Sequence, residues 1–436
     1  MSPRLNISTH WEHLESGSAE ECACFAALGI EMDNRFLTDG VDGFAGKQTN
    51  EPLLSTYHLA QWFVWNWWRL RWEPRSSTAD WAFAHRMATI GEGYVWPNIT
   101  IWSDGERTAL IAKPTPGNGT AKFRYIADYT AIMPSNSFQK VIDAFVTRVR
   151  DQLRKEQISS TNLDHIWDDL IAERNDATMT RRRKLEALLG HEPGEADETL
   201  INQLIEDSQS LGPAAVDELA ADRRGGTPPP RAEELHALAK SYGFATSSKD
   251  AVSLKQKMPP PRGEIAAWKL GAELAHALRI QEQLGDTPIS NERLAEFVGA
   301  TTRFASEGTS PQIFSFAYDK WHGTEGRIVL RSRSEGGRRF ELARLLADRL
   351  YRPTGNQFHA ATRAYTYSQK LQRSFAAELL SPFEAVKDML DGDYSSENQS
   401  EIAKHFGVSD WTVTTLLVNH RVLNRDELDE ELGAVA

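Results

Sequence analysis

Residues 338–348 read Arg-Arg-Phe-Glu-Leu-Ala-Arg-Leu-Leu-Ala-Asp, and residues 375–382 read Phe-Ala-Ala-Glu-Leu-Leu-Ser-Pro. Taken alone, residues 338–350 fit an ordinary amphipathic helix. Arg344 and Asp348 are four residues apart, so on such a helix they can form an ion pair on one face. The order of the two stretches along the chain is more informative than either stretch alone, and it indicates the fold of the C-terminal half.

Together the two stretches resemble the ImmA/IrrE-type zinc metallopeptidase domains of bacterial regulators. Members of that family typically read Arg-Arg-Phe-Thr-Leu-Ala-His-Glu-Leu-Gly-His, with a third ligand Glu shortly before an Asn-x-Phe-Ala-Ala-x-Leu-Leu-x-Pro run. The resemblance puts the first His on Arg344, the catalytic Glu on Leu345 and the second His on Asp348. It puts the third ligand at or near Leu371, and Gln369 is the nearest polar candidate.

The residues at these four positions, which we call the degenerate site, do not suit metal chemistry. A zinc peptidase needs two imidazoles one helical turn apart and a carboxylate that acts as general base. Arg344 is a permanent cation that repels a metal, and Leu345 can neither take nor give a proton. Asp348 alone does not hold zinc. The sequence therefore predicts a pseudo-metallopeptidase without catalytic residues, metal or cofactor.

Composition limits the class of protein. The chain has 436 residues, enough for two or three domains, and a formal net charge of −12, which disfavours a general nucleic-acid binder. No apolar run approaches the 18 or so residues of a membrane helix, and the N-terminus lacks an apolar signal region. We therefore expect a protein that does not enter membranes. Cys22 and Cys24 are too close together for an ordinary disulfide, so we expect the protein in the reducing cytoplasm.

We expect an α+β multidomain fold. Residues 1–134 form a Trp-rich α+β domain, with a buried helix over 57–72 and a hairpin that turns at Asp104-Gly105. Residues 135–222 form a helical segment, and 223–264 a proline-rich linker region with little helix or sheet. Residues 265–436 form a zincin-like α+β domain, ending in a helix-turn-helix-like pair.

That helical pair, residues 399–419, offers an alternative function. Ile402, Ala403 and Phe406, the turn at Gly407, and then Val413 and Leu416 match a helix-turn-helix, so the chain could be a DNA-binding transcriptional regulator. The helix in the recognition position has no Lys or Arg, and residues 397–436 carry eight acidic side chains against three basic ones. Phosphate neutralisation supplies most nonspecific affinity, so DNA is a less favoured partner.

A second metal site can be assembled on paper from His10, His13, Cys22 and Cys24. The His-x-x-His and Cys-x-Cys spacings are each weak, and we expect the two cysteines on a strand with their thiols on one face. The two cysteines are better explained as small buried side chains than as metal ligands. No phosphate-binding glycine-rich loop and no nucleophile elbow occurs in the chain.

The resemblance favours a non-enzymatic regulatory protein that binds another protein, encoded nearby, as a subunit of a toxin-control or antiphage defence system. An enzyme with an unrecognised site in the N-terminal domain is a further alternative. We expect the partner to add to an edge strand at Ile328, Val329 and Leu330, flanked by Arg327, Arg331 and Arg333, with Arg338 and Arg339 just beyond. The competing interpretation is a plain edge strand that its arginines protect from aggregation.

Overall fold

The computed structural model describes residues 4–424 except 77, 117–121, 223–226, 248, 256–262, 306–310, 312–313, 323–324 and 353–356. The chain forms two compact units of mixed α+β structure. The N-terminal unit comprises Met1–Ile201 and Pro261–Glu264, and the C-terminal unit comprises Asn202–Pro260 and Ile265–Ala436. The division falls within α8 (Glu198–Leu211), so the expected helical segment 135–222 is shared between the two units.

The strands of the N-terminal unit pair in three small antiparallel sheets. The first contains β1 (Leu5–Trp11), β2 (Phe25–Met32), β3 (Arg35–Phe36) and β6 (Leu53–Ser55). The second contains β7 (Ile99–Ser103), β8 (Arg107–Ala112) and β10 (Tyr129–Pro134), and the third contains β4 (Gly40–Asp42), β5 (Lys47–Thr49) and β9 (Phe123–Tyr125). The predicted hairpin is confirmed as β7–β8. Its turn forms because the Asp104 carboxylate accepts from the backbone N–H of Glu106 and Arg107.

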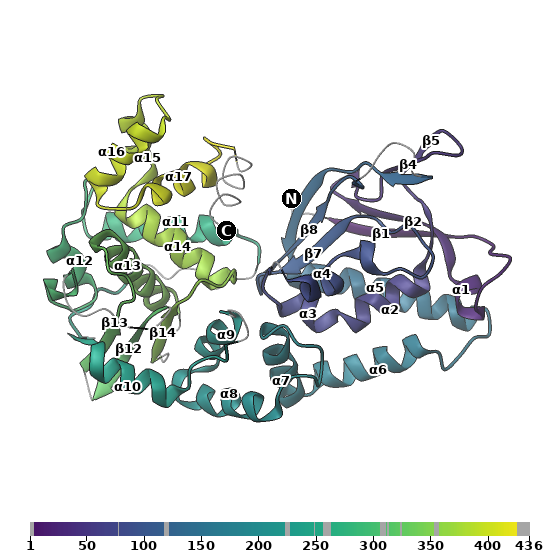
Figure 1. Cartoon of the computed structure of the whole chain (residues 1–436), viewed down its shortest axis with the longest axis horizontal. Coiled ribbons are helices and arrows are strands. Elements are labelled where there is room, and N and C mark those ends of the chain that lie inside the picture. Colours follow the sequence, from purple (N-terminus) through teal and green to yellow (C-terminus); the bar gives the residue numbers. More distant parts are fainter. Residues whose placement is uncertain are drawn as a thin grey trace. The chain divides into compact units, whose positions relative to one another are not determined.

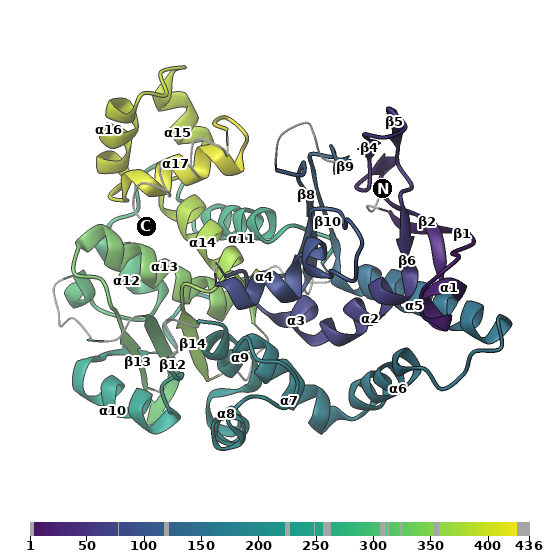
Figure 2. The same ribbon diagram turned by 45° about the vertical axis from the view of Figure 1, so that its right-hand side comes forward.

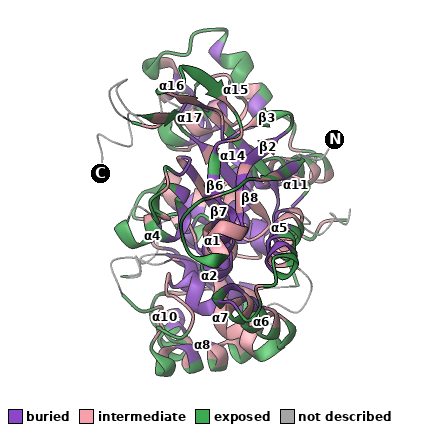
Figure 3. Cartoon of the chain, turned by 90° about the vertical axis from the view of Figure 1, so that its right-hand side faces the viewer, coloured by how far each residue is buried: buried purple, intermediate pink, exposed green. Residues whose placement is uncertain are grey.

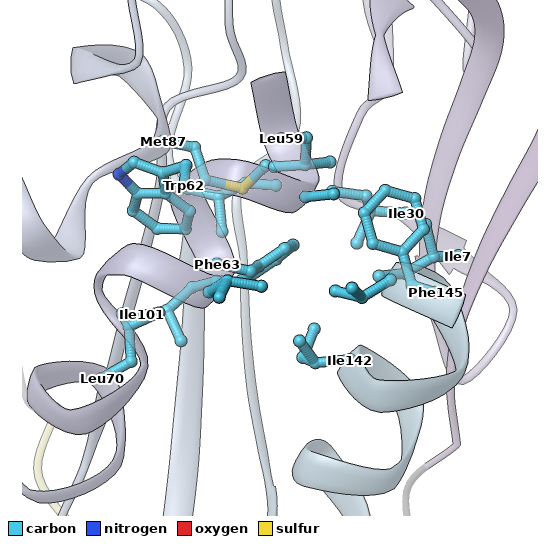
Figure 4. Close-up of a cluster of buried hydrophobic side chains, with 14 of the residues drawn as sticks. Ile7, Ile30, Leu59, Trp62, Phe63, Leu70, Met87, Ile101, Ile142 and Phe145 are labelled. Atoms are coloured by element: carbon cyan, nitrogen blue, oxygen red, sulfur yellow. The ribbon is translucent and has the colours of Figure 1, made fainter. Parts of the chain in front are cut away.

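The Trp-rich segment forms two helices, α2 (Thr56–Trp65) and α3 (Trp67–Trp72), with a break at Asn66. Trp62 and Phe63 are buried among residues of β1, β2, β7 and α5 (Figure 4), whereas Trp65 is 60% exposed. Figure 3 shows α2 as a largely buried element. A helix with apolar residues on nearly every side is stable here because strands and helices surround it.

The remaining helices of the N-terminal unit are α1 (Ala19–Ala23), α4 (Ala79–His85), the short 3₁₀ turn η1 (Met87–Thr89), α5 (Ser135–Lys155), α6 (Asn162–Asn175) and α7 (Ala177–Leu188). The apolar face of α5 packs into the core: Phe138, Ile142, Phe145 and Val149 are all buried.

The C-terminal unit is built on one antiparallel sheet in the order β11-β13-β12-β14 (Figure 1). Its strands are β11 (Phe244–Ser247), β12 (Ser315–His322), β13 (Glu325–Val329) and β14 (Phe358–Ala361). Its helices, besides part of α8, are α9 (Pro213–Ala221), α10 (Ala232–Tyr242), α11 (Ala267–Gln281), α12 (Asn291–Phe297), η2 (Thr302–Ala305), α13 (Glu335–Tyr351), α14 (Tyr367–Leu380), α15 (Phe383–Leu390), α16 (Ser396–Phe406) and α17 (Asp410–Asn419).

The helices α11, α13 and α14 share one apolar core with the sheet. The two helices α11 and α14 run side by side in Figures 1 and 2, and they approach closely because Gly271 has no side chain. A Cβ at that position would lie 2.5 Å from the Leu371 carbonyl oxygen. This close approach carries Leu371 and Phe375 into the core.

Two sequence expectations about this unit are wrong. The region 223–264 is not a plain linker, because it contains α10 and β11; of its second proline run, only Gly263 lies within the described residues. The strand β13 is not at an edge, because β11 pairs with it on one side and β12 on the other. Phe244 pairs with Ile328, so the backbone groups expected to receive a partner already meet this chain's own strand.

The C-terminal helical pair forms as the sequence predicts. Helix α16 ends at Gly407, whose φ of 65° allows the tight turn into α17. Val413, Leu416 and Leu417 are buried in a cluster with Ile402 and Phe406 and with residues of α15. The three helices α15, α16 and α17 lie together in Figures 1 and 2, and α17 also packs against α14.

Candidate functional site

Helix α13 carries the first three positions of the degenerate site and is held at its N-terminus by its own sequence. The Ser334 hydroxyl caps the helix by accepting from the Gly337 N–H at 3.2 Å. Glu341 then ties the helix to the sheet: its Oε2 accepts from the Ser315 hydroxyl at 2.6 Å and from the backbone N–H of Arg331 and Ser332. These bonds set the rotation of the helix, which turns Arg344 and Asp348 toward β14.

Arg344 is buried, and it links α13 to the loop after β14. Its Nη2 donates to the Thr362 carbonyl at 2.5 Å and to the Gln369 Oε1 at 2.6 Å. Burial lowers the pKa of the guanidinium to about 9, and repulsion from Arg373 acts in the same direction. A cation of the protein therefore occupies the position that the resemblance assigns to the first zinc ligand.

Asp348 is 1% exposed and accepts hydrogen bonds from four side chains. These are Arg352 at 2.8 Å, His359 at 2.9 Å, Gln372 at 2.9 Å and Ser368 at 3.2 Å. Burial alone would raise the pKa of this carboxyl, but the attraction of Arg352 and His359 outweighs it and holds the pKa well below its usual range. The predicted ion pair between Arg344 and Asp348 is wrong, because each side chain turns to other partners.

His359 on β14 joins two carboxylates. Its Nδ1 lies 2.9 Å from Asp348 Oδ2, and its Nε2 lies 3.1 Å from Asp319 Oδ2. Burial would lower the pKa of the ring, but the two carboxylates raise it to about 9. The imidazole is therefore a buried cation at neutral pH, and it has no free lone pair for a metal.

The other predicted positions lie either in the apolar core or among the polar groups around Arg344 and Asp348. Leu345 and Leu371 belong to the apolar core, so the position expected for the third ligand does not face the polar groups. Gln369, the nearest polar candidate, does: its Nε2 donates to the Ala360 carbonyl at 2.9 Å, and its Oε1 accepts from Arg344. Gln372 donates to the same carbonyl at 3.2 Å. The sequence reading missed Gln372 and His359, although both flank the quoted motifs.

A further site residue comes from a distant part of the chain. Glu218 on α9, which packs beside β14 in Figures 1 and 2, accepts from the Thr366 hydroxyl at 2.7 Å. Burial raises the pKa of Glu218 to about 6, although Arg352 opposes this. Just after the end of α9, Asp222 accepts from the Arg363 N–H at 3.1 Å. No local sequence signal marks these residues, since α9 reads as an ordinary amphipathic helix.

Four of the five arginines expected to attract a partner have partners within the chain. Arg331 pairs with Glu341 at 3.0 Å, and Arg327 donates to the Gly243 carbonyl at 2.9 Å. Arg338 and Arg339 are buried and donate to the carbonyls of Phe304 and Ile289. Ile328, Val329 and Leu330 are buried as well, and Arg333 is exposed. The strand addition expected at these residues therefore has no free edge.

The N-terminal histidines and cysteines do not assemble. Cys22 lies on α1 and Cys24 caps the end of that helix, so the expectation that both lie on a strand is wrong. Cys24 is fully buried, and burial raises the pKa of its thiol to about 12. Within the described ranges, no group of three or more His, Cys, Asp and Glu side chains is arranged to hold a metal ion.

Comparisons with protein families, with curated proteins and with solved structures give no match for this chain. No helix in the described part of the chain is long and apolar enough to cross a membrane.

Proposed function

We propose that this chain is a non-enzymatic regulatory protein, built on a pseudo-metallopeptidase domain of the ImmA/IrrE type, that binds another protein in the bacterial cytoplasm. A subunit of a toxin-control or antiphage defence system is the role that this family resemblance suggests. The partner is a protein encoded near this one.

The main support is the state of Asp348. Four side chains donate to its carboxylate, two of them cationic, so its charge is already compensated within the chain and a metal ion would have to displace these partners. Leu345 lies in the apolar core where a general base would be needed. The network also links α13, β14 and α14, as a bound metal would, and a domain stabilised in this way can keep its surface for binding after losing catalysis.

Metal content and peptidase activity test the non-enzymatic part. Purified full-length protein should contain far less than one zinc per chain by elemental analysis, and it should not cleave a mixed peptide library. Stoichiometric zinc whose removal by a chelator abolishes cleavage would contradict the proposal.

Restoring the ligands tests the resemblance. The triple variant Arg344→His, Asp348→His, Gln369→Glu should bind about one zinc per chain if the backbone is that of a zinc peptidase, since three ligands are the usual protein set of a catalytic site. The matched control lacks only Gln369→Glu and should bind zinc more weakly. Circular dichroism checks that each variant is folded. A folded triple variant that binds no zinc would refute the resemblance.

Partner binding is tested with the products of neighbouring genes. Each is co-expressed with this chain, and the mixture is analysed by size-exclusion chromatography with light scattering. A stable complex of defined stoichiometry with one of them is the expected result. If this chain elutes alone beside every one of them, the proposed role fails.

A further inference from the structure

Three buried polar atoms in the degenerate site lack a hydrogen-bond partner among the described residues. They are Nε of Arg344, Nη1 of Arg352 and Oε1 of Gln372. The three side chains belong to one network: Gln372 and Arg352 both donate to Asp348, and Gln372 shares the Ala360 carbonyl with Gln369, which contacts Arg344. Buried polar groups are nearly always satisfied, so the two guanidinium donors among these atoms point to a bound group that accepts hydrogen bonds. The Gln372 oxygen is itself an acceptor and would need a different partner, such as water.

The charges show what kind of group this is. Arg344 donates to a carbonyl and an amide, and Arg373 donates to the Ala364 carbonyl at 3.0 Å. Neither guanidinium forms an ion pair with a carboxylate in the described part of the chain. Both are desolvated, which lowers the pKa of each, and the two cations repel each other. The charges of Glu218 and Asp222 act on both guanidinium groups, but among the described residues neither carboxylate forms a direct ion pair with them. A buried cation without a directly paired counter-charge is costly, so an anion bound between the two guanidinium groups would stabilise this arrangement.

We propose that Arg344 and Arg373 form a binding site for a small oxyanion, the chemical class of phosphate, sulfate and carboxylate groups. Guanidinium groups match this class because their planar N–H donors meet two oxygens of one anion. Water would satisfy the hydrogen bonds but not the charge, and a metal cation would be repelled. This site does not depend on the proposed function.

The residues around Arg373 indicate the side from which the anion enters. Arg373 is half-buried, and its guanidinium lies 5.9 Å from the ring centre of Tyr365, which is 54% exposed. Arg344 lies deeper, at 7% exposure. Glu218 and Asp222 are the carboxyl groups that oppose binding, because the charge of each acts on both guanidinium groups. Since burial raises the pKa of Glu218 to about 6, the part of this opposition that comes from Glu218 weakens as the pH falls below that value.

Thermal unfolding and calorimetry with the full chain test the site. Sulfate, phosphate and acetate are titrated against sodium chloride at matched ionic strength. Wild type should show a saturable rise in melting temperature with at least one of the three anions. Arg373→Gln should weaken that binding about tenfold or more, the loss expected for one charge-assisted hydrogen bond. Arg333→Gln removes the same charge from an exposed position and should leave the affinity unchanged.

Two further comparisons identify the chemical source of the bound anion and the pH dependence of its affinity. A preference for acetate indicates a carboxylate ligand, such as a protein carboxyl group, and a preference for phosphate or sulfate indicates a free inorganic anion. Sulfate keeps its charge between pH 5.5 and 7.5, so its affinity should rise toward pH 5.5 in wild type, and Glu218→Gln should remove this rise. Arg344→Met should abolish anion binding if the variant folds. If the variant does not fold, Arg373→Gln, which changes a half-buried residue, tests the site instead. A shift that is not saturable, or one that Arg373→Gln leaves unchanged, overturns the proposal.

Discussion

Asp348 and His359 face each other between α13 and β14, with Oδ2 and Nδ1 2.9 Å apart and both side chains almost inaccessible to water. Because the second ring nitrogen of His359 meets Asp319, the imidazole is a cation held between two carboxylates. This link joins the helix to the strand at the place where the resemblance puts a zinc ligand. It is therefore the best point at which to test how the degenerate site is stabilised.

His359→Gln should destabilise the C-terminal unit by about 3–5 kcal/mol, because it leaves the buried Asp348 and the partly exposed Asp319 without their shared cation. Urea unfolding measures the loss. His405→Gln, an exposed position on α16, is the matched control and should change the free energy of unfolding by less than about 0.5 kcal/mol. Equal effects of the two substitutions would show that the buried link contributes little.

The same pair predicts how stability changes with pH. The folded pKa of His359 is about 9, above the unfolded value of roughly 6.5, so its contribution is complete below pH 6.5 and is lost as the pH rises through 9. The loss should be about 3 kcal/mol at most, since one pKa unit corresponds to about 1.4 kcal/mol. Asp348, whose pKa is lowered, contributes above about pH 4 and loses that contribution in acid. Urea unfolding of wild type and of His359→Gln measures the free energy of unfolding from pH 6.5 to 9.5. If this free energy changes with pH in the same way for both proteins, the raised pKa of His359 is contradicted.

The Trp-rich helix offers a matched pair of positions. Phe63→Ala should cost about 3–5 kcal/mol, because Phe63 is 2% exposed and packs edge-on against Phe138 and Phe145. Trp65→Ala, on the same helix but 60% exposed, should cost far less. Chemical unfolding followed by circular dichroism compares the two, and a larger loss for Trp65→Ala would mean that this residue is buried in an assembly.

Gly271→Ala tests the close approach of α11 and α14. Alanine is the better helix former by about 1 kcal/mol, but the new Cβ would lie 2.5 Å from the Leu371 carbonyl oxygen and 2.9 Å from the Phe375 nitrogen. Backbone atoms in a packed core cannot move aside cheaply, so the variant should be less stable by about 1–3 kcal/mol. Lys269→Ala, exposed on the same helix, is the control. A stabilised Gly271→Ala would show that the two helices can separate.

DNA binding should be weak. Helix α17 has no Lys or Arg, and its Val413, Leu416 and Leu417 side chains are buried in the cluster with α15 and α16. Fluorescence anisotropy with random duplex at moderate salt should give a dissociation constant near or above about 10⁻⁴–10⁻⁶ M. Nanomolar, sequence-selective binding that disappears on truncation after Leu390 would instead support a transcriptional regulator.

By itself the sequence determined the local elements: the hairpin at Asp104-Gly105, the helical structure that begins at residue 135, α13 and the turn at Gly407. These depend on periodicity and turn chemistry within a short window, so no distant residue is needed to predict them. The break of the Trp-rich helix at Asn66 and the helical position of Cys22 were missed, because packing around a short segment overrides its pattern.

Only the tertiary structure decided the contents of the degenerate site. Periodicity put Arg344 and Asp348 on one helix, but their partners come from β14, α14 and α9. The Thr366–Glu218 hydrogen bond spans 148 residues, and the pairing of Phe244 with Ile328 brings a strand from the expected linker to β13. Buried charges take whichever partners the packed chain brings within hydrogen-bonding distance, and that choice is made by the whole fold because burial makes an unpaired charge so costly.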